Sequence, residues 1–464
     1  MLIKHGKMKS LAVLVCAGCI LSIPAVLKAK GWQAGAAKTD VTPDFPVRLS
    51  GYGSRNSPHE GVSLPIHAKA LALRWEADEP VVMLTVDNCG IPAAMRAEVL
   101  ANVRNAGWKL ADERFSLHSS HTHCAPMVNG VLGFLFGADL PPDERNAVDR
   151  YTAFLTARMT EVALSALNDL KPAQVDRGAG KAGFAMNRRL KTETGYANSP
   201  NFEGVRDHDL PVLRVRDMEG KLRALFTSYA CHCTTLAINH IHPDWAGTAQ
   251  AELELRFPGV VALTAIGCGA DQNPFPRREM EHALKHGVTL AKGVIHAINN
   301  PMKPLPGPVI CRSKDLQLPF DTLPGRAEWE MRTQDKNKWI AHHARHFLGM
   351  MERGEKIPDT LPYNVQVWSF GGGLLMIHLP GEVVVDYGLR FKQSFGRQRT
   401  WVNAYTNDVP CYIPSQRVWE EGGYEAAGAM TYYGRPTRFA SGVEEIIAGA
   451  VNELTPQVFK TPGK

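Results

Sequence analysis

Hydrophobic and polar positions change with two different periods along the chain, and each period predicts a kind of element. Short stretches that alternate or are continuously apolar predict strands. These are Ile66–Trp75, Val81–Val86, Phe115–His118, Leu210–Val215, Leu222–Tyr229, Val260–Ile266, Asn364–Phe370 and Leu374–Leu379. Longer stretches with apolar residues three and four apart predict helices. These are Ala93–Ala106, Arg145–Leu170, Arg278–Asn299, Arg326–Met351, Glu382–Phe395 and Val443–Leu454.

The interleaving of strands and helices predicts an α/β fold, with mixed sheets because several strands pair like hairpins. The 464-residue chain shows no internal repeat, flexible linker or charge block. We therefore expect residues 30–464 to form one large domain, in which helices flank the mixed sheets. The proline-rich stretch from Pro301 to Pro308 indicates either a hinge or a surface crossing between elements.

The first 29 residues have the pattern of an export signal. Three lysines precede an apolar stretch, which a proline interrupts before Ala29. This stretch fits a cleaved signal peptide better than a spanning helix. We expect a periplasmic or extracellular protein, cleaved after Ala25 or Ala29. No later segment is long and apolar enough to span a bilayer.

Charge and cysteine content exclude two classes of protein. The formal net charge is +6. Four of the lysines and none of the acidic residues lie in the leader, which leaves about +2 and no electrostatic footprint for nucleic acid. Seven of the nine cysteines remain, in scattered positions. Their spacing indicates neither a zinc ribbon nor a small disulfide scaffold, although one disulfide stays open. The sequence does not reveal the oligomeric state.

Imidazole and carboxylate groups in three distant segments indicate a metal centre. His121 and His123 follow a predicted strand, in which residues two apart point to the same side. His232 follows an apolar strand, and Glu382 ends a Leu-Pro-Gly-Glu segment at the start of a predicted helix. Two imidazoles and a carboxylate with an open position are the ligand set of a catalytic zinc. Taken singly, these residues are also explained as hydrogen-bonded or core histidines and a helix-capping carboxylate.

Three further features could serve a reaction at such a centre. Tyr412 and Tyr424 lie in loops rich in Gly and Pro, where their hydroxyls could donate to an oxyanion or simply pack. Arg188 could hold an anionic intermediate, or it could be a solvated surface residue. The apolar run Val131–Phe136 could receive an acyl chain or be a buried segment. If it binds an acyl chain, it should be partly exposed and line the zinc cleft.

Taken together and in order, these segments resemble the neutral (non-lysosomal) ceramidases, zinc amidases that hydrolyse the N-acyl bond of ceramide. The resemblance begins at Ala34, runs through Gly51-Tyr-Gly53 and the His-Thr-His segment, and ends at Tyr424. It implies the fold of that catalytic domain over nearly all of the mature chain. The residues that it assigns to zinc are His121, His232, Glu382 and Tyr412. Those that it assigns to catalysis are His123 as the proton-transfer residue, and Arg188 and Tyr424 as contacts to the scissile amide or its oxyanion.

One segment departs from the pattern of that family. The ceramidases carry a serine in a Gly-Asp-Val-Ser-Pro-Asn segment, and the matching stretch from Gly267 to Pro274 has no serine. Its Asp271, Gln272 and Asn273 are candidate substrate-binding residues. We also expect no counterpart of the family's C-terminal β-sandwich domain.

The sequence thus predicts an exported zinc hydrolase that cleaves an N-acyl bond of a lipid or related conjugate. An alternative is a zinc amidase or esterase acting on an exported glycan or glycoconjugate, because the polar replacement of the serine segment suits sugar hydroxyls. A less favoured alternative from another class is a binding protein that kept the fold and lost turnover. The complete ligand set argues against that third interpretation.

Overall fold

The computed structural model describes residues 1–2 and 31–460, so nearly all of the predicted signal peptide lies outside the described residues. The described chain is an α/β fold with several mixed sheets, as the pattern predicted. Strands of the main sheet are β1 (Trp32–Asp40), β3 (His67–Trp75), β4 (Val81–Val86), β5 (Phe115–Ser119), β6 (Lys171–Lys181), β9 (Asp209–Arg216), β10 (Leu222–Tyr229), β12 (Val261–Ile266) and β14 (Lys303–Pro304). Within residues 31–460 these nine strands form the large sheet, in the order β12-β10-β9-β6-β1-β3-β4-β5, with β14 beside β6.

A second sheet, the small sheet, packs on one face of the large sheet. It consists of β15 (Val309–Pro319), β16 (Thr360–Phe370), β17 (Leu374–His378) and β19 (Thr400–Asn403), in that order. The remaining strands are short or lie near the site. They are β2 (Gly61–Val62) with β11 (His240–Ile241), β13 (Gln272–Pro274) with β7 (Ala185–Thr192) and β8 (Gly195–Asn201), and β18 (Glu382–Val383) with β20 (Tyr412–Ile413).

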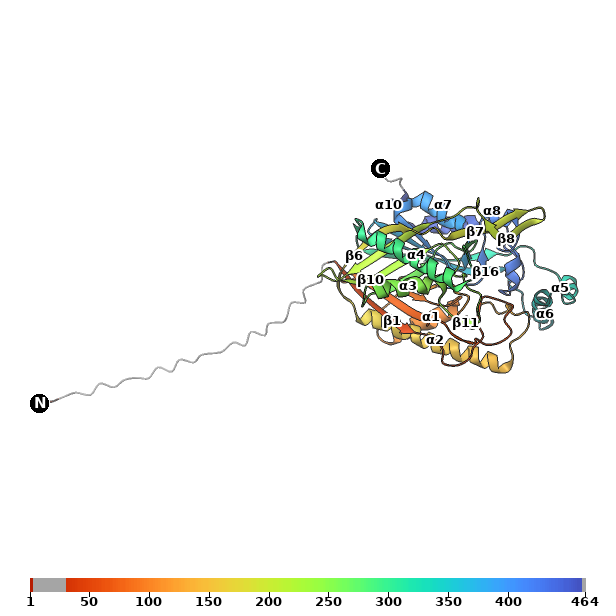
Figure 1. Ribbon diagram of the computed structural model, residues 1–464, viewed down its shortest axis with the longest axis horizontal. Helices are drawn as coiled ribbons and strands as arrows, with labels where there is room; N and C mark the ends of the chain where they lie inside the picture. The colour runs from red at the N-terminus through yellow and green to blue at the C-terminus, as the bar shows by residue number, and fades with distance from the viewer. Residues whose placement is uncertain (3–30, 461–464) are drawn as a thin grey trace.

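Helices cover the outer faces of both sheets (Figure 1). The large sheet is covered by α1 (Ala93–Asn105), α2 (Pro142–Asn168), α3 (Asp244–Arg256) and α4 (Met280–Asn299). On the other side lie α7 (Val385–Phe395), α8 (Gln416–Glu421), α9 (Val443–Leu454) and α10 (Gln457–Lys460). The pair α5 (Arg326–Arg332) and α6 (Lys338–Glu352) projects from the body at the right of Figure 1. The architecture is therefore four layers, helix on sheet on sheet on helix.

Alternation of side chains along the strands explains the layers. Leu71 and Met83 share a core with Trp368 of the small sheet, whereas their neighbours Ala72 and Leu84 lie in the core beneath the helices. This follows from the period of two in a strand, which sends successive side chains to opposite faces. Both faces of both sheets are therefore buried against another layer. Each fully buried aliphatic side chain stabilises the fold by roughly 1.5–3 kcal/mol.

Two predicted helices are wrong in their bounds. The predicted helix Arg326–Met351 is two helices, because the polar segment between α5 and α6 supplies Asn337, whose side chain accepts from Trp339 N and starts a new helix. The predicted helix Glu382–Phe395 begins only at Val385, because Glu382 pairs with Tyr412 as a strand. The capping role considered for Glu382 is therefore not what the structure shows.

The proline-rich stretch 301–308 connects the large sheet to the small sheet and is held along its length. Its β14 pairs with β6, and Leu305 N donates to Val175 O. The structure therefore shows a crossing between elements here. The seven cysteines of the described residues are all free, so the disulfide left open by the sequence is not formed among them.

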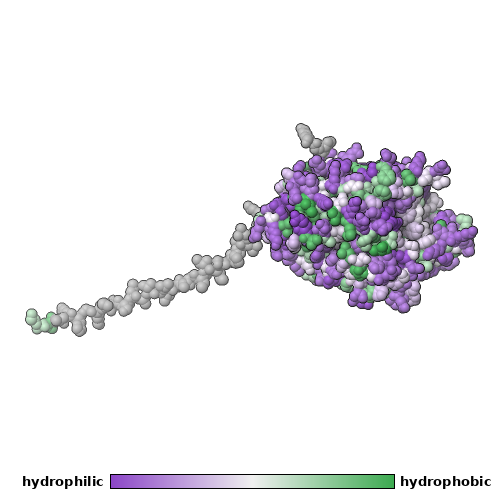
Figure 2. All heavy atoms as spheres, in the orientation of Figure 1, coloured by the Kyte–Doolittle hydropathy of each residue, from purple (hydrophilic) through white to green (hydrophobic). Residues whose placement is uncertain are grey.

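Hydrophilic residues cover most of the face seen in Figure 2, with hydrophobic ones in small groups. None of the helices in the described part of the chain is long and apolar enough to cross a membrane.

Candidate metal centre

Backbone pairing explains how residues far apart in the sequence reach one point. The parallel pair β18 and β20 sets Glu382 directly opposite Tyr412. His232 follows the end of β10, and its N–H donates to Gln272 O. His121 lies two residues beyond the end of β5 and has a left-handed φ of 58°. This turn, rather than the strand geometry that the sequence suggested, directs the His121 ring to the centre.

The predicted ligands lie within hydrogen-bonding distance of one another and are at most 3% exposed. Glu382 Oε2 is 3.2 Å from His121 Nε2 and 3.0 Å from His232 Nε2. The Tyr412 hydroxyl is 3.3 Å from His232 Nε2. The structure therefore brings together all four residues that the resemblance assigns to zinc.

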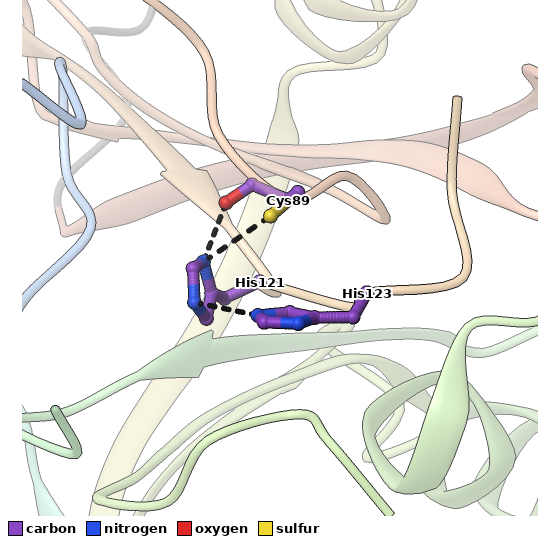
Figure 3. A group of neighbouring side chains, drawn as sticks. All are labelled: Cys89, His121 and His123. Carbon is purple, nitrogen blue, oxygen red and sulfur yellow. Dashed lines mark hydrogen bonds between the residues drawn. The ribbon is translucent and has the colours of Figure 1, made fainter. Parts of the chain in front are cut away.

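The hydrogen bonds on the outer side of the two rings turn both Nε2 atoms toward the Glu382 carboxylate. His121 Nδ1 faces the carbonyl oxygen of Cys89 at 2.5 Å (Figure 3), and His232 Nδ1 faces that of Gly269 at 2.8 Å. Because a carbonyl only accepts, each Nδ1 carries a proton, which leaves each Nε2 to bind a cation, either a proton or a metal ion. Glu382 Oε2 has no hydrogen-bond donor in this structure. Three acceptor atoms within 4.8 Å of one another therefore fit a metal ion, with carbonyls that fix the ligand tautomers.

The electrostatics of the buried groups also favour a positive charge at this point. Burial lowers the pKa of His121, but the Glu382 carboxylate and Cys89 outweigh it and raise that pKa to about 10. Burial raises the pKa of Glu382, but the two histidines hold it well below its usual range. Glu382 thus stays charged although it is buried, and it raises the pKa of the neighbouring His121. Such a carboxylate is suited to binding a divalent cation. Nitrogen and oxygen donors together are the usual ligands of zinc.

Sequence reasoning missed the residues that hold the ligands in place. The Tyr433 hydroxyl donates to Glu382 Oε1, the oxygen that does not face the histidines. Trp245 Nε1 donates to the carbonyl of His232 at 2.8 Å, and the Tyr405 ring lies 4.5 Å from that of His121. Tyr405 and Tyr433 are single aromatic residues whose roles depend on contacts that no local pattern records.

His123 lies beside the predicted ligands, and its ligand atom lies within 4.8 Å of those of Cys89 and His121. Its Nε2 is 3.1 Å from His121 Nε2, as Figure 3 shows, and its ring packs edge-on against Tyr52. Gly51, at a φ of 87°, makes room for this ring, because a Cβ there would lie 2.3 Å from the imidazole. The nearby His240 and His242 make other contacts, and His242 Nδ1 accepts from Asp244 N.

Arg188 and Tyr424 form one side of the centre. Arg188 Nη2 donates to the Tyr412 hydroxyl at 3.0 Å, and its Nε donates to Glu425 Oε1 at 2.8 Å. The guanidinium lies 5.7 Å from the centre of the Tyr424 ring. Tyr424 is 36% exposed and is the most accessible of the predicted site residues. The charge of the buried Arg188 guanidinium is thus balanced by Glu425, while the Tyr424 phenol is accessible to a substrate.

The segment that replaces the family serine is anchored mainly to the protein. Asp271 Oδ1 accepts from Val385 N at 2.9 Å, and Gln272 Nε2 donates to Ala230 O at 2.7 Å. Both side chains are fully buried. Asn273 Oδ1 accepts from Arg188 Nη1 at 3.2 Å. Asn273 also lines a cavity.

Two cavities adjoin the centre, and Arg188 lies between them. The first, which we call the aromatic cavity, measures about 210 Å³. It is lined by His121, His123, Glu382, Tyr412 and Tyr424, by Leu132 and Leu135 of the predicted acyl segment, and by Tyr52, Trp339, Tyr432 and Tyr433. The second, the arginine cavity, measures about 330 Å³ and is lined by Arg188, Arg277, Arg278, Asn273 and their neighbours. A cavity of about 500 Å³ near Lys392 and Trp401 includes none of the ligands.

Comparison with known proteins gives a family and a shared fold. The profile of the family described as neutral/alkaline non-lysosomal ceramidase, N-terminal, matches residues 32–265. The structure resembles the crystal structure of neutral ceramidase from Pseudomonas aeruginosa, with 17% identity, a TM-score of 0.70, and coverage of 93% of this chain and 78% of that chain. A structure described as ceramidase complexed with C2 gives 16% identity, a TM-score of 0.70, and coverage of 94% and 77%. No curated protein sequence matches the chain significantly.

Proposed function

The chain belongs to the neutral/alkaline non-lysosomal ceramidase family, and from that premise we propose that it is an exported zinc hydrolase that cleaves the N-acyl bond of a lipid or related conjugate. The observation that carries this proposal is the convergence of His121 Nε2, His232 Nε2 and Glu382 Oε2 at the end of a cavity. The leader of residues 1–29 supports export, since it has the composition of a signal peptide.

We assign the metal to His121, His232, Glu382 and Tyr412. A zinc ion held there would lower the pKa of a coordinated water to about 7 and polarise the carbonyl of the scissile amide. Tyr433 keeps the Glu382 carboxylate oriented through its other oxygen. The carbonyls of Cys89 and Gly269 keep both imidazoles in the tautomer that offers Nε2.

We assign proton transfer to His123. Its Nε2 faces the predicted ligands, 3.1 Å from His121 Nε2. A neutral imidazole can accept the proton of the attacking water at Nε2 and return it to the leaving amine nitrogen. Positioned acid–base groups of this kind contribute about 10²–10⁴-fold to a rate.

Tyr424 and Arg188 serve the amide oxygen. The Tyr424 phenol lines the aromatic cavity beside Tyr412 and can donate to the developing oxyanion. Arg188 donates to the Tyr412 hydroxyl and is held by Glu425, which fixes a positive charge within reach of the same oxygen.

The aromatic cavity, at about 210 Å³, lies below the roughly 300–1,000 Å³ of typical ligand pockets and is small for a long fatty acyl chain. Leu132 and Leu135 line it, as expected if the 131–136 segment contacts an acyl chain, while Phe134 is half-buried. We therefore propose that a short acyl group, or the first carbons of a longer one, lies against these two leucines.

The lining of the aromatic cavity also favours the alternative, in which the substrate is a glycan or glycoconjugate. The rings of Tyr52, Trp339 and Tyr432 line the cavity, and aromatic rings can stack on a sugar as well as on an acyl chain. The interpretation as a non-catalytic binding protein has less support, since it gives no reason for His121, His232 and Glu382 to lie together.

The proposal is tested with the zinc-loaded chain and three substrates: N-acetylsphingosine, N-palmitoylsphingosine and an N-acetylated disaccharide. We expect release of the amine from at least one of them, with the short acyl substrate favoured over the palmitoyl one. The control is His232→Ala, which should release none. The proposal fails if the zinc-loaded wild type hydrolyses none of the three, or if His232→Ala is as active as the wild type.

A further inference from the structure

The arginine cavity presents positive charge that no acidic residue balances. Among the described residues, neither Arg277 nor Arg278 forms an ion pair with any carboxylate. The other polar residues of the lining are Arg188 and the neutral side chains of Asn187, Asn198, Ser199 and Asn273. A cavity beside a metal centre that holds three guanidinium groups and no lining acid is suited to an anion.

Nearby carboxylates are already engaged elsewhere. Glu425 binds Arg188 and Arg189 at 2.8 and 2.6 Å. Asp271 accepts from Asn187 Nδ2 at 3.3 Å and from Val385 N at 2.9 Å. Arg188 is therefore compensated, whereas the charges on Arg277 and Arg278 remain for a ligand.

Both arginines line the arginine cavity and contact the same residue, Tyr52, which lines the aromatic cavity. Arg277 Nη2 and Arg278 Nη1 each lie 3.4 Å from the Tyr52 hydroxyl, which donates its own proton to Leu236 O. Arg277 is half-buried, and its Nε has no hydrogen-bond partner. Burial, and the neighbouring charges of Arg278 and Arg188, lower the pKa of Arg277. Two guanidinium groups that share one neutral oxygen have donors left for an oxyanion.

We infer that the arginine cavity binds an anionic group, such as a phosphate, sulfate or carboxylate, carried by the amine part of the substrate. This inference rests on the proposed amide hydrolysis, and it names the class of substrate for that site. It makes the chain a hydrolase of anionic N-acyl conjugates rather than of neutral ones.

The division between the two cavities supports this placement. The aromatic cavity contains the ligands and the apolar Leu132 and Leu135, which suit the acyl part. Arg188 contacts Tyr412 of that cavity and lines the arginine cavity, so this one side chain borders both. The exposed ring of Phe275 lines the second cavity and packs edge-on against Phe202. A substrate with a charged end and an apolar portion would contact both surfaces.

The first test measures binding of inorganic phosphate to chelator-treated protein by calorimetry, so that a bound metal cannot provide the site. Arg277→Gln/Arg278→Gln should raise the Kd for phosphate by about 10–100-fold, since charge-assisted hydrogen bonds are worth roughly 1.5–3 kcal/mol. The matched control is Arg312→Gln, an exposed arginine on β15, which should leave the Kd unchanged. Equal Kd values in wild type and the double variant would overturn the inference.

The second test compares N-acetylsphingosine with N-acetylsphingosine 1-phosphate, and N-acetylglucosamine with its 6-phosphate. In the zinc-loaded wild type, one phosphorylated substrate should have a kcat/KM at least about tenfold above its neutral partner, and the double variant should lose this preference. Phosphate binding without such a preference would mean that the cavity binds a free anion. It would overturn the inference that the substrate is an anionic N-acyl conjugate. Hydrolysis of neutral substrates alone would leave the proposed function standing and refute the inference. Arginine-dependent phosphate binding with no hydrolysis of any substrate would instead refute the proposed function.

Discussion

Tyr433 should control metal affinity although it is not a ligand. Its hydroxyl donates to Glu382 Oε1, while Oε2 of the same carboxylate faces the two histidines. Tyr433→Phe removes this donor and leaves a buried carboxylate oxygen without a partner. Such a loss costs about 1–3 kcal/mol, and losing a residue that orients a ligand typically weakens metal binding by about 10–100-fold. We expect a decrease in zinc affinity of that size, with the protein still folded.

The assay is competition for zinc between the protein and a chromogenic chelator, with circular dichroism as the check on folding. Tyr432→Phe is the matched control, because Tyr432 is the adjacent residue and lines the same aromatic cavity, while its hydroxyl is not bonded to Glu382. An unchanged zinc affinity in Tyr433→Phe would refute the reasoning. An equal loss in both variants would refute it as well, since general disturbance of the cavity would then explain the effect.

Three other variants test different parts of the account. Gly51→Ala places a Cβ 2.3 Å from the His123 ring and should lower kcat by about 100-fold with zinc content unchanged, whereas Gly107→Ala, at a φ of 98° with nothing within 4 Å, should not. His232→Ala should lose metal and activity together while its circular dichroism spectrum is retained; stoichiometric metal in this variant would contradict the assignment. Burial raises the pKa of Asp408 from 3.8 to about 6, so the folded state keeps a proton that the unfolded state releases, and the contribution of Asp408 to the unfolding free energy should fall by up to ~3 kcal/mol as the pH rises from about 4 to 6. Urea denaturation should show the unfolding free energy of the wild type falling by this amount relative to that of Asp408→Asn; parallel profiles would contradict it.

The parts of the fold with a strong local pattern could be predicted from the sequence. β4, β10 and α9 have the predicted bounds, because continuous apolar runs and helical periodicity are local properties. The short strands β18 and β20 could not be predicted, since each has two residues and forms only through pairing with the other. For the same reason the helix predicted from the sequence begins at Glu382, where the chain in the structure is extended.

The candidate site shows the same limit. The sequence suggested which residues meet, and the structure places His121, His232, Glu382 and Tyr412 together. The reasons for their meeting were not visible, because they lie in a left-handed turn at His121, a strand pair and buried carbonyl groups. The arginine cavity could not be predicted, because the sequence does not show which residues surround Arg277 and Arg278. Among the described residues, no acidic side chain lines this cavity.

The measurement that tests the central claim most directly is the metal content of the purified mature chain, by elemental analysis, in wild type and in His121→Ala. His121 is chosen because its Nε2 lies 3.2 Å from Glu382 Oε2 and its tautomer is fixed by Cys89 O. The account predicts about one zinc ion per wild-type chain and none in the variant. A wild-type chain that binds no metal even when zinc is supplied, or a variant that keeps its zinc, would contradict it.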